Sequence, residues 1–217
     1  MANKGLLIVI SGPSGAGKGT ICNELIKRDG FYLSVSATTR LPRKGEAEGV
    51  NYYFLSKEDF TKKIERNDFF EYAEVYGNYY GTPKAKVLEM LDKGKDVILE
   101  IDIQGALKVK ETYPDGIFIF ILPPSMEELK KRIIGRGSET PESLMRRFKS
   151  AYAEINYVSK YNYAVVNDSI ECAAEKIESI ISAEKCRVDR IEESLLNSKE
   201  GIIHEQFYDR SINSWFT

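Results

Sequence analysis

One stretch of the sequence constrains the fold more than any other: an apolar run, a glycine-rich turn and a helical pattern follow one another between residues 6 and 26. The apolar run 6–10 is uniformly hydrophobic, which predicts a parallel strand buried on both faces. The turn 11–20 that follows contains Gly12, Gly15, Gly17 and Gly19. A strand, a glycine turn and a helix start in this order form a phosphate-binding site, because glycines let successive N–H groups point inward at the positive end of the helix.

The spacing of Gly12, Gly17 and Lys18 matches the G-x-x-x-x-G-K part of the Walker A pattern, in which the lysine supplies a mobile charge for the outer phosphates of a nucleotide. The next position departs from the pattern. Gly19 stands where Ser or Thr is expected, and the hydroxyl comes one position later at Thr20. We therefore expect no metal ligand from residue 19. Mg²⁺ would be held mainly through water and phosphates, with a share for Thr20 as the other hypothesis.

Length and composition exclude several classes of protein. The 217 residues are enough for one sizeable domain. A net charge of −2 gives no general basic character, so we expect no binding of nucleic acid or of membranes. The three cysteines have no metal-ligand spacing, and no apolar stretch is long enough to cross a membrane. These features predict a cytoplasmic protein and leave open whether it is a monomer or a homo-oligomer.

Strand and helix patterns alternate along the chain. In the main series, strand patterns occur at 6–10, 31–35, 96–102, 117–122 and 163–167. Their alternation with helical patterns predicts an α/β fold with three layers, in which helices flank a central parallel sheet. Residues 36–45 are polar and contain Pro and Gly, so we expect a loop there. From 50 to 82, short strand patterns around one helical pattern predict a small lobe inserted into the main sheet.

Two groups of arginines are candidates for binding anions. Arg40 and Arg43 lie three apart in the polar loop, where a solubilising surface and a phosphate site both account for them. Arg132, Arg136 and Arg147 form a second group, which is either a solvated basic face or a mobile anion clamp. The phosphate loop in the same chain favours the clamp.

Two acids are candidates for ligand contacts. Glu71 stands between aromatic residues in a strand pattern, so its carboxylate either faces solvent or is available to accept a hydrogen bond from a donor. Asp102 follows the end of a buried strand. Acids in that position lie where open α/β sheets bind their ligands.

The sequence resembles the guanylate kinase family over about its first 187 residues. The motifs that carry the resemblance lie at 12–18, 34–43, 77–82, 101–105 and 132–147. The first motif is shared by many kinases, whereas the others in this order are specific. The resemblance implies a P-loop NTPase fold and the Mg²⁺-dependent transfer of the γ-phosphate of ATP to GMP, and also to dGMP.

The resemblance also implies a role for each matching residue on the donor side. The ATP phosphates would be bound by the loop residues Gly12, Pro13, Ser14, Gly15, Ala16, Gly17, Lys18, Gly19 and Thr20. Arg132 and Arg136 would bind ATP as well, and Asn167 would lie near the adenine. The catalytic groups would be Lys18, Arg40, Arg132, Arg136 and Arg147.

On the acceptor side, the resemblance implies two sets of contacts. The phosphate of GMP would be bound by Arg40, Arg43, Tyr52 and Tyr80, and the guanine would contact Ser36, Glu71, Thr82 and Asp102. Guanine presents two adjacent donors, N1–H and the N2 amino group, that one carboxylate can accept together. We therefore expect Glu71 to select guanine over adenine, by roughly 10⁴-fold, because the wrong base leaves buried acceptors unpaired.

Domain boundaries follow from the same resemblance. Residues 1–187 would form the kinase domain, with a GMP-binding lobe at about 36–82 and a mobile lid at about 132–150 that closes to exclude water. Residues 188–217 would be a C-terminal extension of unknown role. Two other functions remain open: a P-loop kinase for a different small phosphate acceptor, and a non-catalytic interaction module of the same fold.

Overall fold

The computed structural model describes residues 4–190 apart from 44, 76 and 135–140. Residues 4–176 form one compact unit, and the described residues from 177 onward belong to a second unit. The first unit contains two sheets. The main sheet has the strand order β2-β7-β1-β8-β9, with bounds β1 Leu7–Ser11, β2 Phe31–Leu33, β7 Asp96–Glu100, β8 Ile117–Leu122 and β9 Tyr163–Val166. Its four pairings are all parallel, which confirms the predicted α/β architecture.

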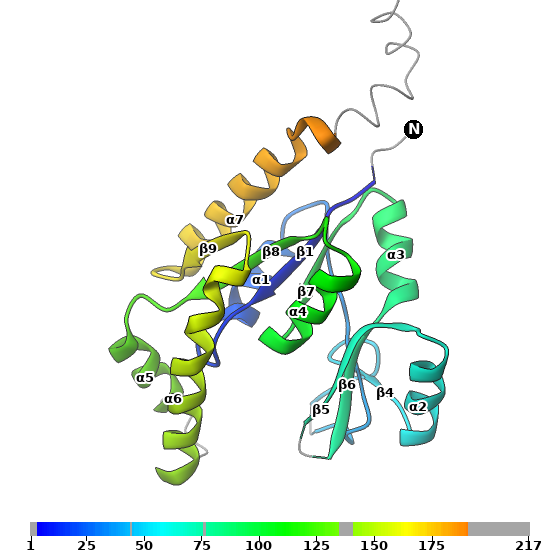
Figure 1. The fold of residues 1–217 in the computed structure, drawn as a ribbon, viewed down its shortest axis with the longest axis horizontal. Helices are drawn as coiled ribbons and strands as arrows, with labels where there is room; N and C mark the ends of the chain where they lie inside the picture. Colours follow the sequence, from blue (N-terminus) through cyan, green and yellow to red (C-terminus); the bar gives the residue numbers. More distant parts are fainter. Residues whose placement is uncertain (1–3, 44, 76, 135–140, 191–217) are drawn as a thin grey trace, which may run out of the picture. The chain divides into compact units, whose positions relative to one another are not determined.

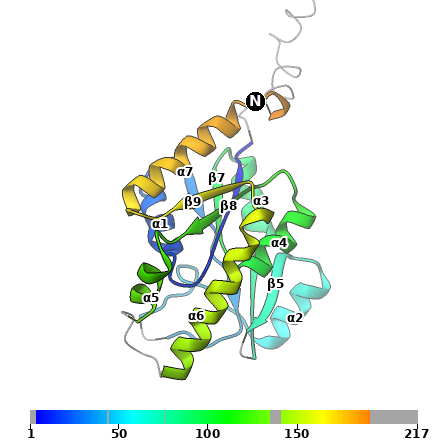
Figure 2. The same ribbon diagram turned by 60° about the vertical axis from the view of Figure 1, so that its left-hand side comes forward.

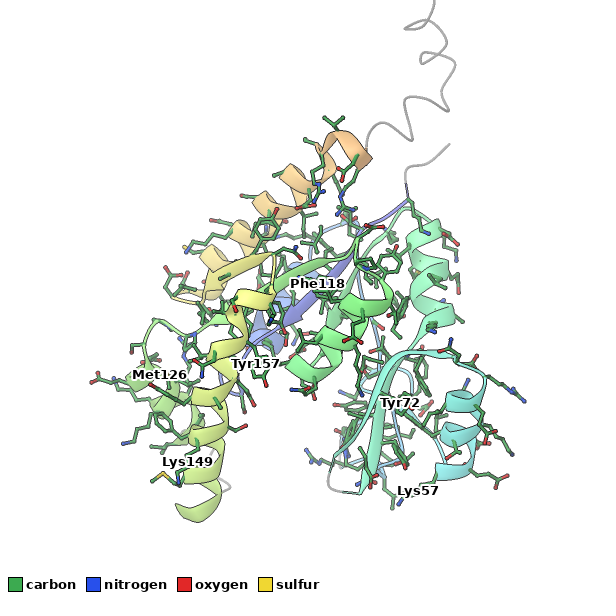
Figure 3. The ribbon with its side chains drawn as sticks, in the orientation of Figure 1. Lys57, Tyr72, Phe118, Met126, Lys149 and Tyr157 are labelled. Atoms are coloured by element: carbon green, nitrogen blue, oxygen red, sulfur yellow. The ribbon has the colours of Figure 1, made fainter. Side chains whose placement is uncertain are left out.

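Helices cover both faces of the main sheet. The helices are α1 Lys18–Leu25, α2 Lys57–Glu65, α3 Lys84–Asp92, α4 Ile103–Thr112, α5 Met126–Ile134, α6 Pro141–Ile155 and α7 Ile170–Lys185, with a 3₁₀ turn, η1, at Asn156–Lys160. One core cluster joins Val87 and Leu91 of α3 and Val109 of α4 to Val9 and Phe118 of the sheet. Phe118 is labelled among these side chains in Figure 3. Helix α1 lies on the opposite side of the sheet from α4 (Figure 2), which completes the three layers.

The second sheet forms a lobe between Ala37 and Pro83 (Figure 1). Its strands follow the order β4-β3-β6-β5, with bounds β3 Ala37–Thr38, β4 Tyr53–Phe54, β5 Phe69–Val75 and β6 Asn78–Pro83. Phe60 of α2 stacks on Phe69 with ring centroids 4.5 Å apart, and Ala37 packs in the same small core. The predicted inserted lobe is therefore a four-stranded sheet with α2 packed against it.

One prediction of local structure was wrong. The loop predicted at 36–45 contains β3, which lies between β4 and β6 in the second sheet. The strand has only two residues, so it carries no alternating pattern that could reveal it. Its position depends on long-range backbone pairing, including the hydrogen bond from Thr39 N–H to the carbonyl oxygen of Tyr79, at 3.0 Å.

Two helix ends carry residues that are typical of their positions. The Ser125 hydroxyl accepts a hydrogen bond from Glu128 N–H at 3.1 Å, as expected for a capping residue, and Gly94 closes α3 with a φ of 75°. No helix in the described part of the chain is both long enough and apolar enough to span a bilayer. The predicted C-terminal extension is described only as far as Arg190.

Candidate active site

The loop between β1 and α1 has a backbone that glycine alone adopts readily. Gly12, Gly15 and Gly17 have φ values of 142°, 90° and 94°. A Cβ atom on Gly12 would collide with the carbonyl oxygen of Ile121 on β8, so the loop passes directly over the neighbouring strand. Gly17 is the N-cap of α1 and provides no capping side chain. The first turn of α1 therefore offers its N–H groups and its positive dipole end at this loop.

Lys18 lies folded over the same loop. Its ammonium donates hydrogen bonds to the carbonyl oxygens of Gly12 at 2.7 Å and Pro13 at 3.1 Å. The side chain is only partly buried, so the charge stays near the protein surface. The loop, the helix end and the lysine together make a concentrated positive site at the carboxyl end of β1.

The position that departs from the Walker A pattern is closely approached by an acid. A Cβ atom on Gly19 would lie 3.2 and 3.3 Å from the two carboxylate oxygens of Glu100, the last residue of β7. The carboxylate thus lies beside α1, where a side chain of residue 19 would begin. The acidic end of this strand was expected to lie where ligands bind, but Glu100 itself was not among the predicted site residues.

In the second sheet, Glu71 and Thr82 form a buried pair. Glu71 is 8% exposed, and the Thr82 hydroxyl donates a hydrogen bond of 2.7 Å to its Oε1. A Cβ atom on Gly105 of α4 would lie 3.0 Å from Oε2, so the carboxylate packs closely against a helix position that has no side chain. Burial, with a smaller contribution from the charge of Asp102, raises the pKa of Glu71 to about 7 against the lowering effect of the Thr82 hydrogen bond.

Two other predicted base contacts, Asp102 and Ser36, lie on segments next to this pair. Asp102 is the N-cap of α4 and accepts a hydrogen bond from Gly105 N–H at 2.7 Å. The two acids lie on either side of Gly105, where a Cβ atom would be 3.0 Å from Oε2 of Glu71 and 3.3 Å from Oδ1 of Asp102. Ser36 immediately precedes β3, and its carbonyl oxygen accepts a hydrogen bond from Tyr53 N–H at 2.9 Å.

Arg40 lies in a polar and aromatic cluster that extends from β3. Its guanidinium donates one hydrogen bond to each carboxylate oxygen of Glu46, both at 2.9 Å. It also lies 5.5 Å from the centroid of the Tyr52 ring, which contacts the Tyr80 ring edge-on at 6.0 Å. The hydrogen bonds between the two charged groups raise the pKa of Arg40 and lower the pKa of Glu46. Three predicted phosphate contacts, Arg40, Tyr52 and Tyr80, are therefore brought together.

Arg43 joins this cluster through its backbone. Its N–H donates a hydrogen bond of 2.7 Å to Glu46, while its side chain is exposed. Glu46 thus organises both arginine positions, and sequence reasoning did not single it out. The available signal was its spacing, since an acid three residues after Arg43 and six after Arg40 in one loop can pair with either.

Arg132 of α5 and Asn167 meet at the phosphate loop. Arg132 donates through Nε to Glu128 at 3.1 Å and through Nη2 to the backbone carbonyl of Asn167 at 3.3 Å. The side-chain amide of Asn167 donates a hydrogen bond of 2.8 Å to the carbonyl oxygen of Ala16, in the loop. The predicted partners of Arg132, namely Arg136 and the side chain of Arg147, lie outside the described residues.

These features define a class. A glycine loop that joins a central parallel strand to a helix, a lysine folded over the loop, and an inserted lobe with its own arginine cluster are the parts of a P-loop kinase for a small phosphorylated acceptor.

Comparison with known proteins gives the family. A family model described as guanylate kinase matches residues 4–184. Guanylate kinase of Clostridium tetani is 77% identical over 206 residues, which are 95% of this chain and 99% of that protein. Guanylate kinase of Caldanaerobacter subterraneus is 63% identical, with 91% and 96% covered. A crystal structure of guanylate kinase from Anaplasma phagocytophilum matches with a TM-score of 0.73 at 37% identity, covering 91% of this chain and 97% of that one. The chain belongs to the guanylate kinase family.

Proposed function

We propose that the residues described above carry out the reaction of the guanylate kinase family, the ATP-dependent phosphorylation of GMP to GDP. The assignment is supported most by one observation: a buried acid lies in the same compact unit as two separate positive sites. One positive site is the loop with Lys18, and the other is the cluster around Arg40. Two such sites fit a reaction with two phosphorylated ligands, ATP and GMP. The buried carboxylate of Glu71 fits the recognition of a purine base.

On the donor side, the loop residues and Lys18 would bind the phosphates of ATP, with Arg132, Arg136 and Arg147 supplying further positive charge. Phosphoryl transfer requires little covalent help from the protein, so these groups would act by aligning donor and acceptor and by neutralising charge on the transferred group. The position of Lys18 over the loop supports this role.

Mg²⁺ is proposed as the ion that accompanies ATP. The Glu100 carboxylate beside Gly19 is a hard oxygen donor of the kind that Mg²⁺ prefers, directly or through water, and Thr20 remains a second candidate. Within the described part of the chain no three metal-binding side chains come together, so water and phosphate oxygens would complete the ligand set. The ion would neutralise charge on the phosphate oxygens.

On the acceptor side, Arg40, Arg43, Tyr52 and Tyr80 would bind the phosphate of GMP. The Glu46 carboxylate fixes the plane of the Arg40 guanidinium, and ring contacts hold it from the side. A guanidinium held in this way is suited to a phosphate, because its N–H groups already have a defined direction.

The guanine base would be recognised by Glu71, with Thr82, Ser36 and Asp102 around it. The Thr82 hydroxyl holds one carboxylate oxygen of Glu71 in place, which supports a fixed orientation toward N1–H and the N2 amino group. Since dGMP carries the same base and phosphate, we propose it as a second acceptor.

A coupled assay of ADP release tests this proposal with GMP, dGMP, AMP and UMP as acceptors. We expect release with GMP and dGMP and little with the other two. Lys18→Ala should reduce turnover by at least about 10²-fold, because it removes charge that stabilises the transferred group. Release with AMP but not GMP would overturn the base assignment, and failure to bind ATP would favour a non-catalytic interaction module.

A further inference from the structure

We infer that Asn167 is a positioning residue for the phosphate loop, which it holds through its side chain while it holds Arg132 through its backbone. The inference rests on the proposed function, in which the loop binds the phosphates of ATP. It gives Asn167 a role that does not require contact with the adenine base.

The position of Asn167 is fixed by the main sheet. It directly follows β9, and its N–H donates a hydrogen bond of 2.8 Å to the carbonyl oxygen of Leu122 at the end of β8. Its side chain then reaches across to Ala16, 151 positions away in the sequence, with an Nδ2 to oxygen distance of 2.8 Å. Asn167 is only 3% exposed, so the side chain is directed into the protein. The end of β9 is thus followed by a buried side-chain amide that donates a hydrogen bond to the phosphate loop.

The atom that it holds, the carbonyl oxygen of Ala16, belongs to the phosphate loop itself. Ala16 is fully buried and lies between Gly15 and Gly17, both of which have φ values in the left-handed region, at 90° and 94°. The N–H of Ala16 donates to the carbonyl oxygen of Pro13 at 3.1 Å. With its carbonyl held by Asn167, the Ala16 residue is fixed on both sides. The adjacent peptide groups then have a defined direction for their N–H donors.

Close packing supports the same role. A Cβ atom on Gly17 would collide with the Nδ2 atom of Asn167, so the amide lies directly against the loop backbone. Without that amide, the buried carbonyl oxygen of Ala16 would lose its hydrogen-bond partner, which is unfavourable for a group shielded from water.

Arg132 is tied to the same residue. Its Nη2 donates to the backbone carbonyl oxygen of Asn167 at 3.3 Å, while its Nε pairs with Glu128 at 3.1 Å. Asn167 therefore contacts both the loop and a guanidinium proposed to act on the same phosphates. The position of Asn167 therefore sets how the phosphate loop and the Arg132 guanidinium lie relative to each other.

The test uses two variants, Asn167→Ala and Asn167→Asp, and three ligands: Mg²⁺–tripolyphosphate, Mg²⁺–ATP and GMP. Tripolyphosphate carries phosphates but no base. We expect Asn167→Ala to bind Mg²⁺–tripolyphosphate and Mg²⁺–ATP about tenfold more weakly, by the same factor for the two ligands, and Asn167→Asp to bind both more weakly still, with GMP affinity unchanged in both variants. In steady-state kinetics, KM for ATP should rise while KM for GMP stays the same. The alanine variant separates the lost donor from the added charge of aspartate.

Asn162→Asp provides the matched control. Asn162 precedes β9, and its Oδ1 accepts a hydrogen bond of 3.0 Å from Phe118 N–H, which an aspartate can also accept. This variant introduces the same chemical change at the opposite end of β9, away from the loop. We expect it to bind all three ligands as the unchanged protein does.

Three results would overturn the inference: unchanged binding of both triphosphates, weaker binding of ATP alone, which would indicate a contact with the base, or an equal loss of GMP binding, which would indicate a general structural role. Failure of the proposed function gives a different result. In that case the unchanged protein would not bind Mg²⁺–tripolyphosphate, or Lys18→Ala would bind it equally well.

Discussion

The protonation state of Glu71 decides how many hydrogen bonds the proposed base site can accept. Burial raises the pKa of this carboxyl group to about 7, so both forms are populated near neutral pH in the free protein. The ionised form can accept from two guanine donors, whereas the protonated form has a donor of its own and a weaker acceptor set. Binding of guanine therefore favours the ionised form and releases a proton when the pH lies below about 7.

We predict that GMP binding weakens as the pH falls below about 7, approaching tenfold per pH unit well below that value. The sign follows from the raised pKa: protonation stabilises the free protein as the pH falls from about 7 toward the ordinary value of 4.5, and this competes with GMP. Titration calorimetry from pH 5.5 to 8.5 measures the effect. Glu71→Gln is the control, because it retains the titration of the GMP phosphate but loses that of the carboxyl group. An identical pH profile for the two proteins would contradict the prediction.

Some residues of the candidate site could be predicted from the sequence, and others could not. Lys18 was singled out by the loop pattern, whereas the proposed role of Glu71 came from the family resemblance and is consistent with the two adjacent donors of guanine. Glu46 and the hydrogen bond from Asn167 to Ala16 could not be predicted, because both depend on how the backbone folds back on itself. In particular, no local pattern indicates which residue will meet a loop that lies 151 positions away.

At the scale of elements, long apolar strands and capped helices were predictable, because buried runs and capping residues are local signals. Strand β3 was missed, since it is too short for a pattern and depends on pairing with β4 and β6. The close approach of α4 to β5 was also beyond prediction. It depends on Gly105, because a side chain at that position would lie against Glu71, and the sequence does not show that these two residues are neighbours.

Gly105→Ala tests this contact between elements. Alanine favours a helix over glycine by about 1 kcal/mol, so local propensity alone would stabilise α4. The added Cβ would lie 3.0 Å from Oε2 of Glu71, and we predict that it displaces the carboxylate. KM for GMP should then rise about tenfold, a loss of roughly one hydrogen bond, while KM for ATP stays unchanged.

The control for that substitution is Gln104→Ala in the same turn, where the side chain is exposed. It changes helix propensity without adding an atom near Glu71, so KM for GMP should stay as in the unchanged protein. If KM for GMP rises in both variants, the effect comes from a change in α4 itself and not from the contact between residue 105 and Glu71.

At the scale of the whole molecule, the proposed donor and acceptor sites belong to different sheets. The loop and Lys18 lie at the end of β1 in the main sheet, whereas the Arg40 cluster and Glu71 belong to the second sheet. Phosphoryl transfer requires the two ligands in line and water excluded from the γ-phosphate. A kinase assembled from two sheets can meet both requirements by closing only when both nucleotides are bound.

We predict that GMP together with an unreactive ATP analogue slows tryptic cleavage within 132–150, the proposed lid, more than either ligand alone. Trypsin can cut there after Arg132, Arg136, Arg146, Arg147 and Lys149, and mass spectrometry identifies which of these sites is cleaved. The reason is that a lid acting on the donor phosphates gains contacts only when the acceptor is also in place. Glu71→Gln should abolish the added effect of GMP while leaving that of the analogue. Equal cleavage rates with and without the ligand pair would show that the sites meet without closure of this segment, and the water-excluding step would then need another element.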